Sequence, residues 1–544
     1  MVITDSSFKN QNDRMSYSPV LIPGAPIVLG NRTATANVVS ETEGKAPDDQ
    51  VSNYVGTKLA LKLPRLSIPK EGMDPEDVYK LIRSDLSMDA NPQMHLGTFL
   101  TTDMDDQALR LMNESCGKNF VDFGVYPETT DISERCRNMI ASTFHAPGNQ
   151  SETFKGTGCS TVGSSEAIFL GVLALKIRWQ ENRKKNNLDA SKPNMTFGSN
   201  AHQTWQKAAC YLEIDPRIVK VNPETLCVDP VNLIAQVDEN TISITMTLGD
   251  MPTNDLQMEQ FTGKYEDIQT LDNLLGKKME QPGWDSQATV EKWSVGIHVD
   301  AATGGFVAPS VSSALTPNDA SLIWDFQLPN VVSINVSGHK YGLTYPGLGW
   351  ALWREPQYVP EQMTQFNNVT YGKSLPDYNI NHSKGTEQII GQYYIFTRFG
   401  KDQMQEIILS LLDKAHRFAL RLVNNGNFKI WSAGDVRYGV PMISFSLMGG
   451  KAFDEEKLSA CLRTRGWIVP VFKRPETETK HNLPTESGES GKMLLRIIIR
   501  DDFSDTRADK LYSEISAVVA LLLSDPKADS VAVANLVDSM SKSS

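Results

Sequence analysis

Helical stretches alternate with short apolar runs through the middle of this chain. The helical stretches cover Asp131–Phe144 and Ser165–Asn182, and the apolar runs cover Ile242–Thr247, Trp293–Val299 and Val331–Val336. Short runs rich in β-branched residues are typical of strands. Because parallel strands are joined by helical crossovers, this alternation predicts an α/β fold with a mainly parallel sheet. We assign it to a large domain of residues 113–400.

The pattern changes after this domain. Lys401–Asn424 has the pattern of a long helix, and Met442–Ser446 and Met493–Ile499 have that of strands. These elements predict a small α+β domain over residues 401–524.

Other segments are more polar. Residues 1–56 carry scattered proline and glycine and predict a partly ordered arm. The segment 57–112 contains a predicted helix, Asp74–Arg83, which begins at an Asp-Pro pair. Thr477–Gly491 predicts a loop, and residues 525–544 form a weakly amphipathic tail.

Composition excludes several classes of protein. The 544 residues are 40% hydrophobic, which is enough for a large core and more than one domain. The net charge of -12 and the lack of a basic patch argue against a nucleic-acid partner. The six cysteines have no C-x-x-C spacing, which argues against a metal site and fits a reducing compartment. Met1–Asn12 has no apolar core and no run approaches ~20 apolar residues, so we expect a cytoplasmic protein that does not span a membrane.

Lys340 is the most informative residue. The apolar run Val331–Val336 ends in Ser337-Gly338, and His339-Lys340 follow at once, which places the lysine at the end of a predicted strand. Lysine forms Schiff bases with carbonyl compounds, including pyridoxal 5'-phosphate (PLP). A surface lysine in a loop is the alternative, and three features upstream argue against it.

Asp300 is the first of these features. It ends the apolar run Trp293–Val299, and ligands of open α/β sheets bind outside the carboxyl ends of the strands. A carboxylate beside the pyridine nitrogen of PLP keeps that nitrogen protonated, so that the ring accepts electrons. The alternative is an aspartate that caps a helix or turn.

The second feature is the Gly/Ser/Thr-rich loop Gly156–Ser165, which precedes an apolar helical stretch. Phosphate binds at helix N-termini, where free N–H groups and the helix dipole meet it, and Ser164 and Ser165 add hydroxyl donors. An ordinary helix start is equally compatible with the pattern. The third feature is His202, whose flat ring could stack on a cofactor, although a histidine in the core or on the surface would give the same pattern.

The order of these motifs resembles that of the group II PLP-dependent amino-acid decarboxylases, most closely the glutamate decarboxylase branch, over roughly residues 60–515. The stretches that carry the resemblance include His95–Phe99, Lys118–Asp122, Tyr126–Thr130, Gly163–Ala167, Thr262–Asp267, His298–Ala302, Ser333–Gly342, Gly391–Phe396 and Leu495–Ile497. The resemblance implies a PLP-dependent transferase fold (fold type I) and a homodimer or higher homo-oligomer, with residues 57–112 wrapped around the partner subunit.

The same resemblance implies roles for individual residues. Lys340 is expected to form the Schiff base, Asp300 to pair with the pyridine nitrogen, and His202 to stack on the ring. The implied phosphate ligands are Ser164, Ser165, Ser337 and His339, and Ser383 is expected to reach the phosphate from the neighbouring subunit. Thr247 is expected to lie beside the cofactor ring. No metal is expected.

Substrate residues follow from the resemblance as well. Arg496 is expected to bind the substrate α-carboxylate, since a guanidinium forks onto a carboxylate. An ion pair with Asp501 or Asp502 is the alternative for this arginine. The implied pocket for the distal carboxylate consists of Thr98, Phe99, Asn119 and Asp122. Because Asp122 would face a substrate carboxylate, we expect higher activity at mildly acidic pH.

The implied function is PLP-dependent decarboxylation of L-glutamate to 4-aminobutyrate and CO2. His202 replaces the glutamine usual in glutamate decarboxylases, so another amino-acid substrate, aspartate or an aromatic one, stays open. A non-catalytic PLP-fold protein is a third alternative, which the intact set of cofactor residues argues against. The stretches 250–261 and 310–319 are predicted to be inserted surface loops, the first near the site entrance. Calmodulin is not expected to bind, because residues 516–544 hold two lysines and no tryptophan.

Overall fold

The structure is a computed structural model. It describes residues 63–121, 123–249, 262–314, 322–364, 367–370, 373–376, 378–433, 435–473, 493–528 and 532–533. The predicted arm 1–56, the 250–261 insertion, the loop Thr477–Gly491 and most of the 525–544 tail lie outside these residues. The chain divides into two units, residues 1–88 and 89–544.

The first unit contains helix α1 (Pro75–Leu86). The Asp74 carboxylate accepts hydrogen bonds from the N–H groups of Glu76 and Asp77, and Pro75 occupies the first helical position. This confirms a helix that begins at the Asp-Pro pair. Tyr79, Ile82 and Leu86 are exposed on α1 at helical spacing, so the helix carries an uncovered apolar stripe.

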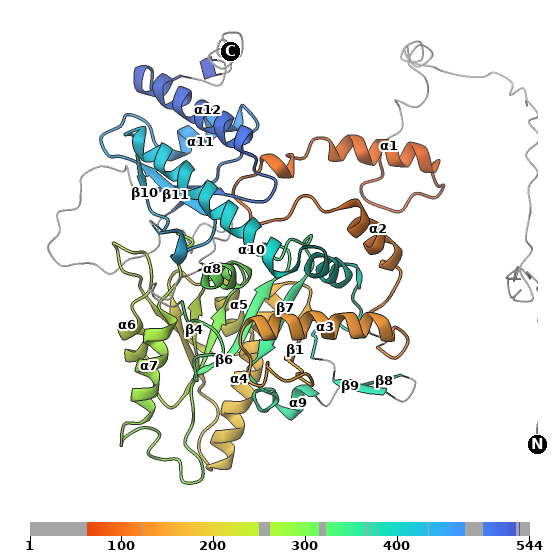
Figure 1. Ribbon diagram of the computed structural model, residues 1–544, viewed down its shortest axis with the longest axis vertical. Coiled ribbons are helices and arrows are strands. Elements are labelled where there is room, and N and C mark those ends of the chain that lie inside the picture. The colour runs from red at the N-terminus through yellow and green to blue at the C-terminus, as the bar shows by residue number, and fades with distance from the viewer. Residues whose placement is uncertain are drawn as a thin grey trace, which may run out of the picture. The chain divides into compact units, whose positions relative to one another are not determined.

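The second unit is built on a seven-stranded sheet with the order β1-β7-β6-β5-β4-β2-β3 (Figure 1). The strands are β1 (Thr157–Thr161), β2 (Asn194–Gly198), β3 (Asp215–Val219), β4 (Thr241–Thr247), β5 (Gly296–Asp300), β6 (Val331–Ser337) and β7 (Gly349–Trp353). Strands β3, β2, β4, β5 and β6 are parallel, and β7 runs antiparallel to β6 and β1. This confirms the predicted α/β fold.

Helices cover the large sheet. They are α3 (Pro127–Thr143), α4 (Ser164–Lys185), α5 (Gln203–Tyr211), α6 (Pro230–Ala235), α7 (Ile268–Met279) and α8 (Ala308–Ala314). Every residue of β2, β4, β5, β6 and β7 is buried, as expected for strands covered on both faces.

Register places three polar side chains in one row. Thr247 at the end of β4 pairs with Asp300 at the end of β5, and Asp300 pairs with Asn335 of β6. Because the strands are parallel, their carboxyl ends lie at one edge of the sheet. The turn that carries Lys340 begins directly after β6 at the same edge.

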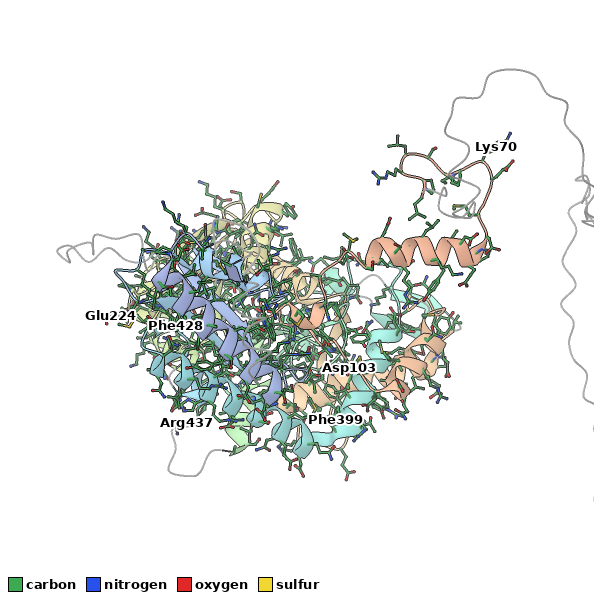
Figure 2. The ribbon with its side chains drawn as sticks, turned by 90° about the horizontal axis from the view of Figure 1, so that it is seen from above. Lys70, Asp103, Glu224, Phe399, Phe428 and Arg437 are labelled. Atoms are coloured by element: carbon green, nitrogen blue, oxygen red, sulfur yellow. The ribbon has the colours of Figure 1, made fainter. Side chains whose placement is uncertain are left out.

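The C-terminal part has an antiparallel sheet of order β10-β11-β13-β12. Its strands are β10 (Phe428–Ile430), β11 (Met442–Leu447), β12 (Val471–Lys473) and β13 (Met493–Ile498), and its helices are α11 (Glu455–Arg463) and α12 (Asp505–Ser524). Phe428, labelled in Figure 2, packs edge-on against Phe445 with the ring centres 5.3 Å apart. Smaller elements are α2 (Asp106–Ser115), α9 (Glu361–Thr364), β8 (Asn367–Thr370) and β9 (Lys373–Pro376).

Two boundaries differ from the sequence prediction. Helix α10 spans Glu387–Asn424 with a break at Gly400, where φ is 61° and ψ is -176°, so the predicted start at Lys401 marks only its second half. The predicted loop 310–319 is wrong for its first residues, because 310–314 complete helix α8, where Val311 is buried against the core. Residues 315–319 lie outside the described chain.

Among the helices in the described residues, none is long and apolar enough to cross a bilayer.

We expect the ion pair between His145 and Asp325 to stabilise the fold at acidic pH only. The Asp325 carboxylate, 2.7 Å from His145 Nδ1, raises the pKa of the imidazole through their hydrogen bond. A folded pKa above the unfolded value of about 6.5 means that the contribution is complete below about pH 6.5. It is lost as pH rises through the folded pKa. Since the imidazole is half exposed, the contribution is below about 1 kcal/mol.

Urea denaturation of the single and double variants of His145→Gln and Asp325→Asn measures the coupling free energy of this pair. A coupling that is equal at about pH 5.5 and about pH 8.5 would contradict the expectation.

Candidate active site

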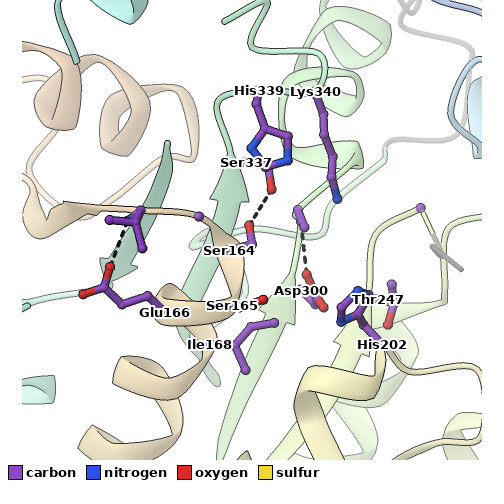
Figure 3. Close-up of a pocket in the computed structure, with 14 residues that line it drawn as sticks. Ser164, Ser165, Glu166, Ile168, His202, Thr247, Asp300, Ser337, His339 and Lys340 are labelled. Atoms are coloured by element: carbon purple, nitrogen blue, oxygen red, sulfur yellow. Dashed lines mark hydrogen bonds between the residues drawn. The ribbon is translucent and has the colours of Figure 1, made fainter. Parts of the chain in front are cut away.

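A cavity of about 240 Å³ lies at the carboxyl ends of β4, β5 and β6 (Figure 3). Eight residues singled out in the sequence line it: Ser164, Ser165, His202, Thr247, Asp300, Ser337, His339 and Lys340. The others in its wall are Val162, Gly163, Glu166, Ile168, Gly249 and Ala302. Segments up to 178 residues apart in sequence, from Val162 to Lys340, therefore meet at one site.

Lys340 is buried, and Figure 3 shows its side chain pointing from the turn after β6 toward Asp300 and His202. Its Nζ donates to Thr303 Oγ1 at 3.4 Å. Burial lowers the pKa of the ammonium group to about 7, with Asp300 acting in the opposite direction and Arg496 lowering it further. A substantial fraction of the amine is therefore unprotonated and nucleophilic at neutral pH.

The turn that carries Lys340 is fixed by other parts of the unit. Thr101 donates its N–H to the His339 carbonyl at 3.1 Å and its hydroxyl to the Lys340 carbonyl at 3.3 Å. Gln392 of α10, fully buried, donates Nε2 to the Gly342 carbonyl at 2.9 Å. These contacts hold the lysine backbone in place at the edge of the sheet.

Asp300 accepts hydrogen bonds on both carboxylate oxygens. Trp205 Nε1 donates to Oδ2 at 2.9 Å, Asn335 Nδ2 donates to Oδ1 at 2.9 Å, and the Ala302 N–H donates to Oδ1 at 3.2 Å. Hydrogen bonds to a carboxylate favour its charged form. Three donors thus fix the position of the buried Asp300 carboxylate in the cavity wall.

The N-terminus of α4 forms the opposite end of the cavity. Within the described residues, no side chain caps the first N–H groups of this helix, which starts at Ser164 after Gly163. Ser164 Oγ lies 2.7 Å from Ser337 Oγ, so hydroxyls from α4 and β6 converge there. Such an end is suited to a phosphate group.

Close packing shapes this end further. A Cβ atom added to Gly349 of β7 would stand 2.4 Å from the main-chain carbon of Gly163. Only glycine at 349 lets the strand approach the α4 N-terminus so closely. The Glu166 carboxylate accepts from the N–H groups of Val162 at 2.8 Å and Ile380 at 2.9 Å, so its charge is used in fixing the loop.

Two neutral histidines face the site. Burial lowers the pKa of His202 to about 4, with Asp300 opposing the shift and Lys340 adding to it. His202 Nδ1 accepts from the Thr204 N–H at 3.2 Å, so Nε2 carries the proton. Burial and the nearby Lys340 also lower the pKa of His339 to about 4, and its Nδ1–H donates to the Leu348 carbonyl at 3.2 Å.

The side chains at the two ends of the cavity fit PLP. Hydroxyls and free N–H groups at one end suit its phosphate, and the Asp300 carboxylate suits a protonated pyridine nitrogen. Lys340 stands between them with a nucleophilic amine. Within the described part of the chain, no group of three or more His, Cys, Asp or Glu side chains is arranged as metal ligands.

Arg496 of β13 is buried near the lysine. Its guanidinium lies 4.3 Å from the centre of the Phe472 ring and 5.8 Å from that of Phe99, and it donates to the Gly97 carbonyl. Of the two acids considered as alternative partners, Asp502 is paired with Arg500, and Asp501 lines a small cavity together with Phe99 and Lys340.

The other predicted substrate residues are dispersed. Phe99 lines a second, smaller cavity with Lys340, and its ring centre is 5.9 Å from Lys340 Nζ. Thr98 precedes it. Asn119 Nδ2 donates to Ser383 Oγ at 3.3 Å, and neither residue lines the 240 Å³ cavity of its own chain. Asp122 lies outside the described residues.

Arg500 was missed in the sequence, yet it holds the segment that carries Thr98 and Phe99. Its guanidinium binds Asp502 through two hydrogen bonds of 3.0 and 3.1 Å, and Thr102 Oγ1 donates to Asp502 at 2.9 Å. The same guanidinium donates to the carbonyls of Pro92, Gln93, His95 and Thr98 at distances from 2.9 to 3.5 Å.

Replacement of Arg500 with methionine is expected to lower the free energy of unfolding by about 1–3 kcal/mol, because it removes the donor of several carbonyls and two hydrogen bonds to the Asp502 carboxylate, which keeps Thr102 and Arg507 as partners. Urea denaturation measures the change. Arg417→Met is the matched control, since this arginine pairs with Asp413 on the exposed surface of α10 and the loss should stay below about 1 kcal/mol. Equal losses for the two variants would refute the assigned role of Arg500.

Further site residues escaped the sequence analysis. Trp205, Thr303 and Gln392 have no local pattern that distinguishes them from core residues. Asn335 did have one, because Ser333, Asn335 and Ser337 place a polar side chain at every second position of an otherwise apolar strand. That period predicts a polar face on β6.

The chain matches a known family model and several known proteins. Residues 65–448 match the model of the pyridoxal-dependent decarboxylase conserved domain. Glutamate decarboxylase 5 of Arabidopsis thaliana is 37% identical over 482 residues, 89% of each chain. The glutamate decarboxylase of Aliivibrio fischeri is 34% identical over 475 residues, 87% of this chain and 93% of that one.

Solved structures of other proteins have a similar fold. The glutamate decarboxylase of Lactobacillus brevis superposes with a TM-score of 0.73 at 33% identity, over 86% of this chain and 97% of that one. Oryza sativa TDC with PLP and tryptamine has a TM-score of 0.63 at 14% identity, over 88% of this chain and 93% of that one, and shows a likeness of fold alone.

Proposed function

This chain belongs to the pyridoxal-dependent decarboxylase family, and we propose that it converts L-glutamate to 4-aminobutyrate and CO2. The observation that carries the proposal is the buried trio of Lys340, Asp300 and Arg496, in which the other two charges both act on the pKa of the lysine. It combines a nucleophilic amine, an anion for the cofactor ring and a cation for a carboxylate. Relatives at 34–37% identity that carry the name glutamate decarboxylase support glutamate as the substrate.

PLP, when bound, accepts the electron pair that the departing carboxylate leaves on the α-carbon. The N-terminus of α4, with Ser164 and Ser165, would hold the cofactor phosphate, and the Asp300 carboxylate would keep the pyridine nitrogen protonated. Lys340 provides the amine that binds the cofactor covalently, since its pKa of about 7 leaves it partly unprotonated. The neutral ring of His202, which lines the same cavity, would shield a bound cofactor from water.

Arg496 binds the substrate α-carboxylate and orients the bond to be broken. Burial strengthens this interaction, because few water molecules compete for the guanidinium. Phe99 and Phe472 limit the positions that the guanidinium can take. A fixed guanidinium presents parallel N–H donors to a carboxylate, which sets its plane as well as its position.

The proposed active form is a homodimer in which each subunit completes the site of the other. Asn119 and Ser383 contact one another outside the cavity of their own chain, which supports a role in the partner's site. The exposed apolar stripe of α1 supports burial against a second subunit.

An absorbance spectrum of the purified protein, followed by CO2 release from glutamate, aspartate, tyrosine and histidine, tests the function. A visible cofactor band with turnover of glutamate is expected. A band with turnover of another amino acid alone would move the proposal to the alternative that His202 keeps open. A protein without a band or turnover would refute the proposal.

Arg496→Met is expected to reduce kcat/KM for glutamate by roughly 10²–10³-fold, the cost of removing one partner of a buried charge pair. The visible band should persist, because Arg496 does not line the cofactor cavity. Steady-state CO2 release gives the rate constants. Arg463→Met, on the exposed side of α11, is the control and should keep the activity of the unaltered protein. Unchanged kcat/KM in the Arg496 variant would exclude it as the carboxylate ligand.

A further inference from the structure

We propose that His298 and Asn335 are positioning residues that hold Asp300 as a hydrogen-bond acceptor facing the cofactor ring nitrogen. This inference rests on the role proposed for Asp300 above. It assigns a function to two buried polar residues that lie in the sheet behind the cavity.

The four residues involved form a block across two neighbouring strands. In the parallel register of β5 and β6, His298 pairs with Ser333 and Asp300 pairs with Asn335. His298 Nδ1 lies 2.8 Å from Ser333 Oγ, and His298 Nε2 lies 2.8 Å from Asn335 Oδ1. Asn335 Nδ2 then donates to Asp300 Oδ1 at 2.9 Å. All four side chains are buried.

The direction of each hydrogen bond follows from the last one. A carboxylate only accepts, so Asn335 must present its NH₂ group to Asp300 and its amide oxygen to His298. His298 must therefore donate from Nε2, which leaves Nδ1 to accept from the Ser333 hydroxyl. Burial lowers the pKa of His298 to about 4, with Asn335 and Asp300 opposing the shift, and this agrees with a neutral imidazole that has one N–H.

This tautomer prevents the asparagine from turning over. A flipped Asn335 would point its oxygen at the Asp300 carboxylate and its NH₂ group at the Nε2–H of His298. Both contacts would be repulsive, and burial would make them more costly. His298 thus acts on Asp300 through Asn335.

The other hydrogen bonds of the Asp300 side chain also come from donors. The Trp205 indole and the Ala302 N–H can only donate. Among the described residues that bond to this carboxylate, every partner is a donor, so a proton on Asp300 would find no acceptor in the protein wall. The acceptor capacity that is left faces the cavity.

The surroundings leave room for an aromatic ring at residue 298. A Cβ atom added to Gly171 of α4 would stand 2.6 Å from His298 Cε1. On another side the Trp205 ring meets the imidazole edge-on, with the ring centres 4.9 Å apart. Gly171 and Trp205 thus fix the plane of the imidazole, and with it the direction of the Nε2–H.

The tautomer can be measured in the unaltered holoenzyme. Nitrogen NMR of the protein with ¹⁵N-labelled histidine should show, besides the signal of His202, a second buried, neutral imidazole protonated at Nε2 at about pH 6, and His298→Gln should remove that second signal alone. A charged His298, or one protonated at Nδ1, would overturn the proposal.

A matched pair of variants tests the effect on the cofactor. His298→Phe keeps a ring but removes both nitrogens, whereas His298→Gln keeps an amide N–H that can donate to Asn335. With ¹⁵N-labelled PLP bound, the ring-nitrogen signal should shift toward the unprotonated position in His298→Phe and stay near that of the unaltered protein in His298→Gln. Cofactor affinity should fall about tenfold in the first variant only.

If the ring-nitrogen signal of PLP does not shift in His298→Phe, or shifts equally in both variants, His298 contributes to packing only and the proposal is wrong. Neither measurement uses glutamate, so a protein that binds PLP but decarboxylates another amino acid would leave this test intact. The tautomer measurement uses the unaltered protein and His298→Gln, so it decides the proposal even if His298→Phe does not fold.

Discussion

Replacement of Lys340 with methionine is expected to lower the rate of CO2 release by roughly 10³-fold or more. The variant loses the amine that binds the cofactor covalently, and with it the hydrogen bond from Nζ to Thr303 Oγ1. Methionine is unbranched and similar in length, so the buried space at 340 stays filled. The fold should therefore survive while the chemistry is lost.

Absorbance spectroscopy and CO2 release measure the two consequences of this change. The Lys340 variant should bind PLP without the visible band of the covalent form. Lys277→Met, at the exposed end of α7, is the control for a lost lysine and should retain both band and activity. A Lys340 variant within tenfold of the unaltered rate would mean that another amine serves as nucleophile.

Asp300→Asn is expected to lower kcat by roughly 10²–10³-fold, the cost of losing one preorganised charge at a reacting centre. The substitution removes the anion that holds the proton on the ring nitrogen. It also places an amide NH₂ among Trp205, Asn335 and Ala302, which all donate at this position. Donor would then face donor in a buried site, so cofactor affinity should fall as well.

Rates of CO2 release and equilibrium titration with PLP separate these two effects. Asp413→Asn, on the exposed face of α10, is the control for a lost negative charge. If activity at saturating PLP is restored in the Asp300 variant, the residue contributes to cofactor affinity alone and has no role in the chemical step.

The core of the site could be predicted from sequence because its parts are local. Lys340 follows a strand directly, Asp300 ends one, and Ser164 and Ser165 begin a helix. In a parallel sheet these three kinds of position converge at one edge. The structure places all four residues around one cavity.

The supports of the site could not be predicted in the same way. Arg500 lies about 400 residues from the carbonyls that it binds, and only the packing of the C-terminal sheet brings them together. Gln392 holds the Lys340 turn from the middle of a long helix, where its sequence context is that of a core position. Long-range contacts of this kind leave no period or motif in the sequence.

Ser383 and Asn119 illustrate a different limit. Both were identified by resemblance, and a single chain places them together but away from the cavity. A site that two subunits share forms only when the subunits associate. Sequence patterns report on the neighbours of a residue within one chain far better than on contacts across an interface.

The shared register of β4, β5 and β6 determines where this chain tolerates changes of length. Side chains alternate between the two faces of a strand. A single-residue deletion at the start of β5 (Gly296–Asp300) would therefore move the His298 and Asp300 side chains to the other face of the sheet. A deletion of the same size in the connection between α7 and β5 would leave the row of Thr247, Asp300 and Asn335 intact. Natural variation in length should therefore collect in the connections, while the three strands keep a constant residue count from one lineage to the next.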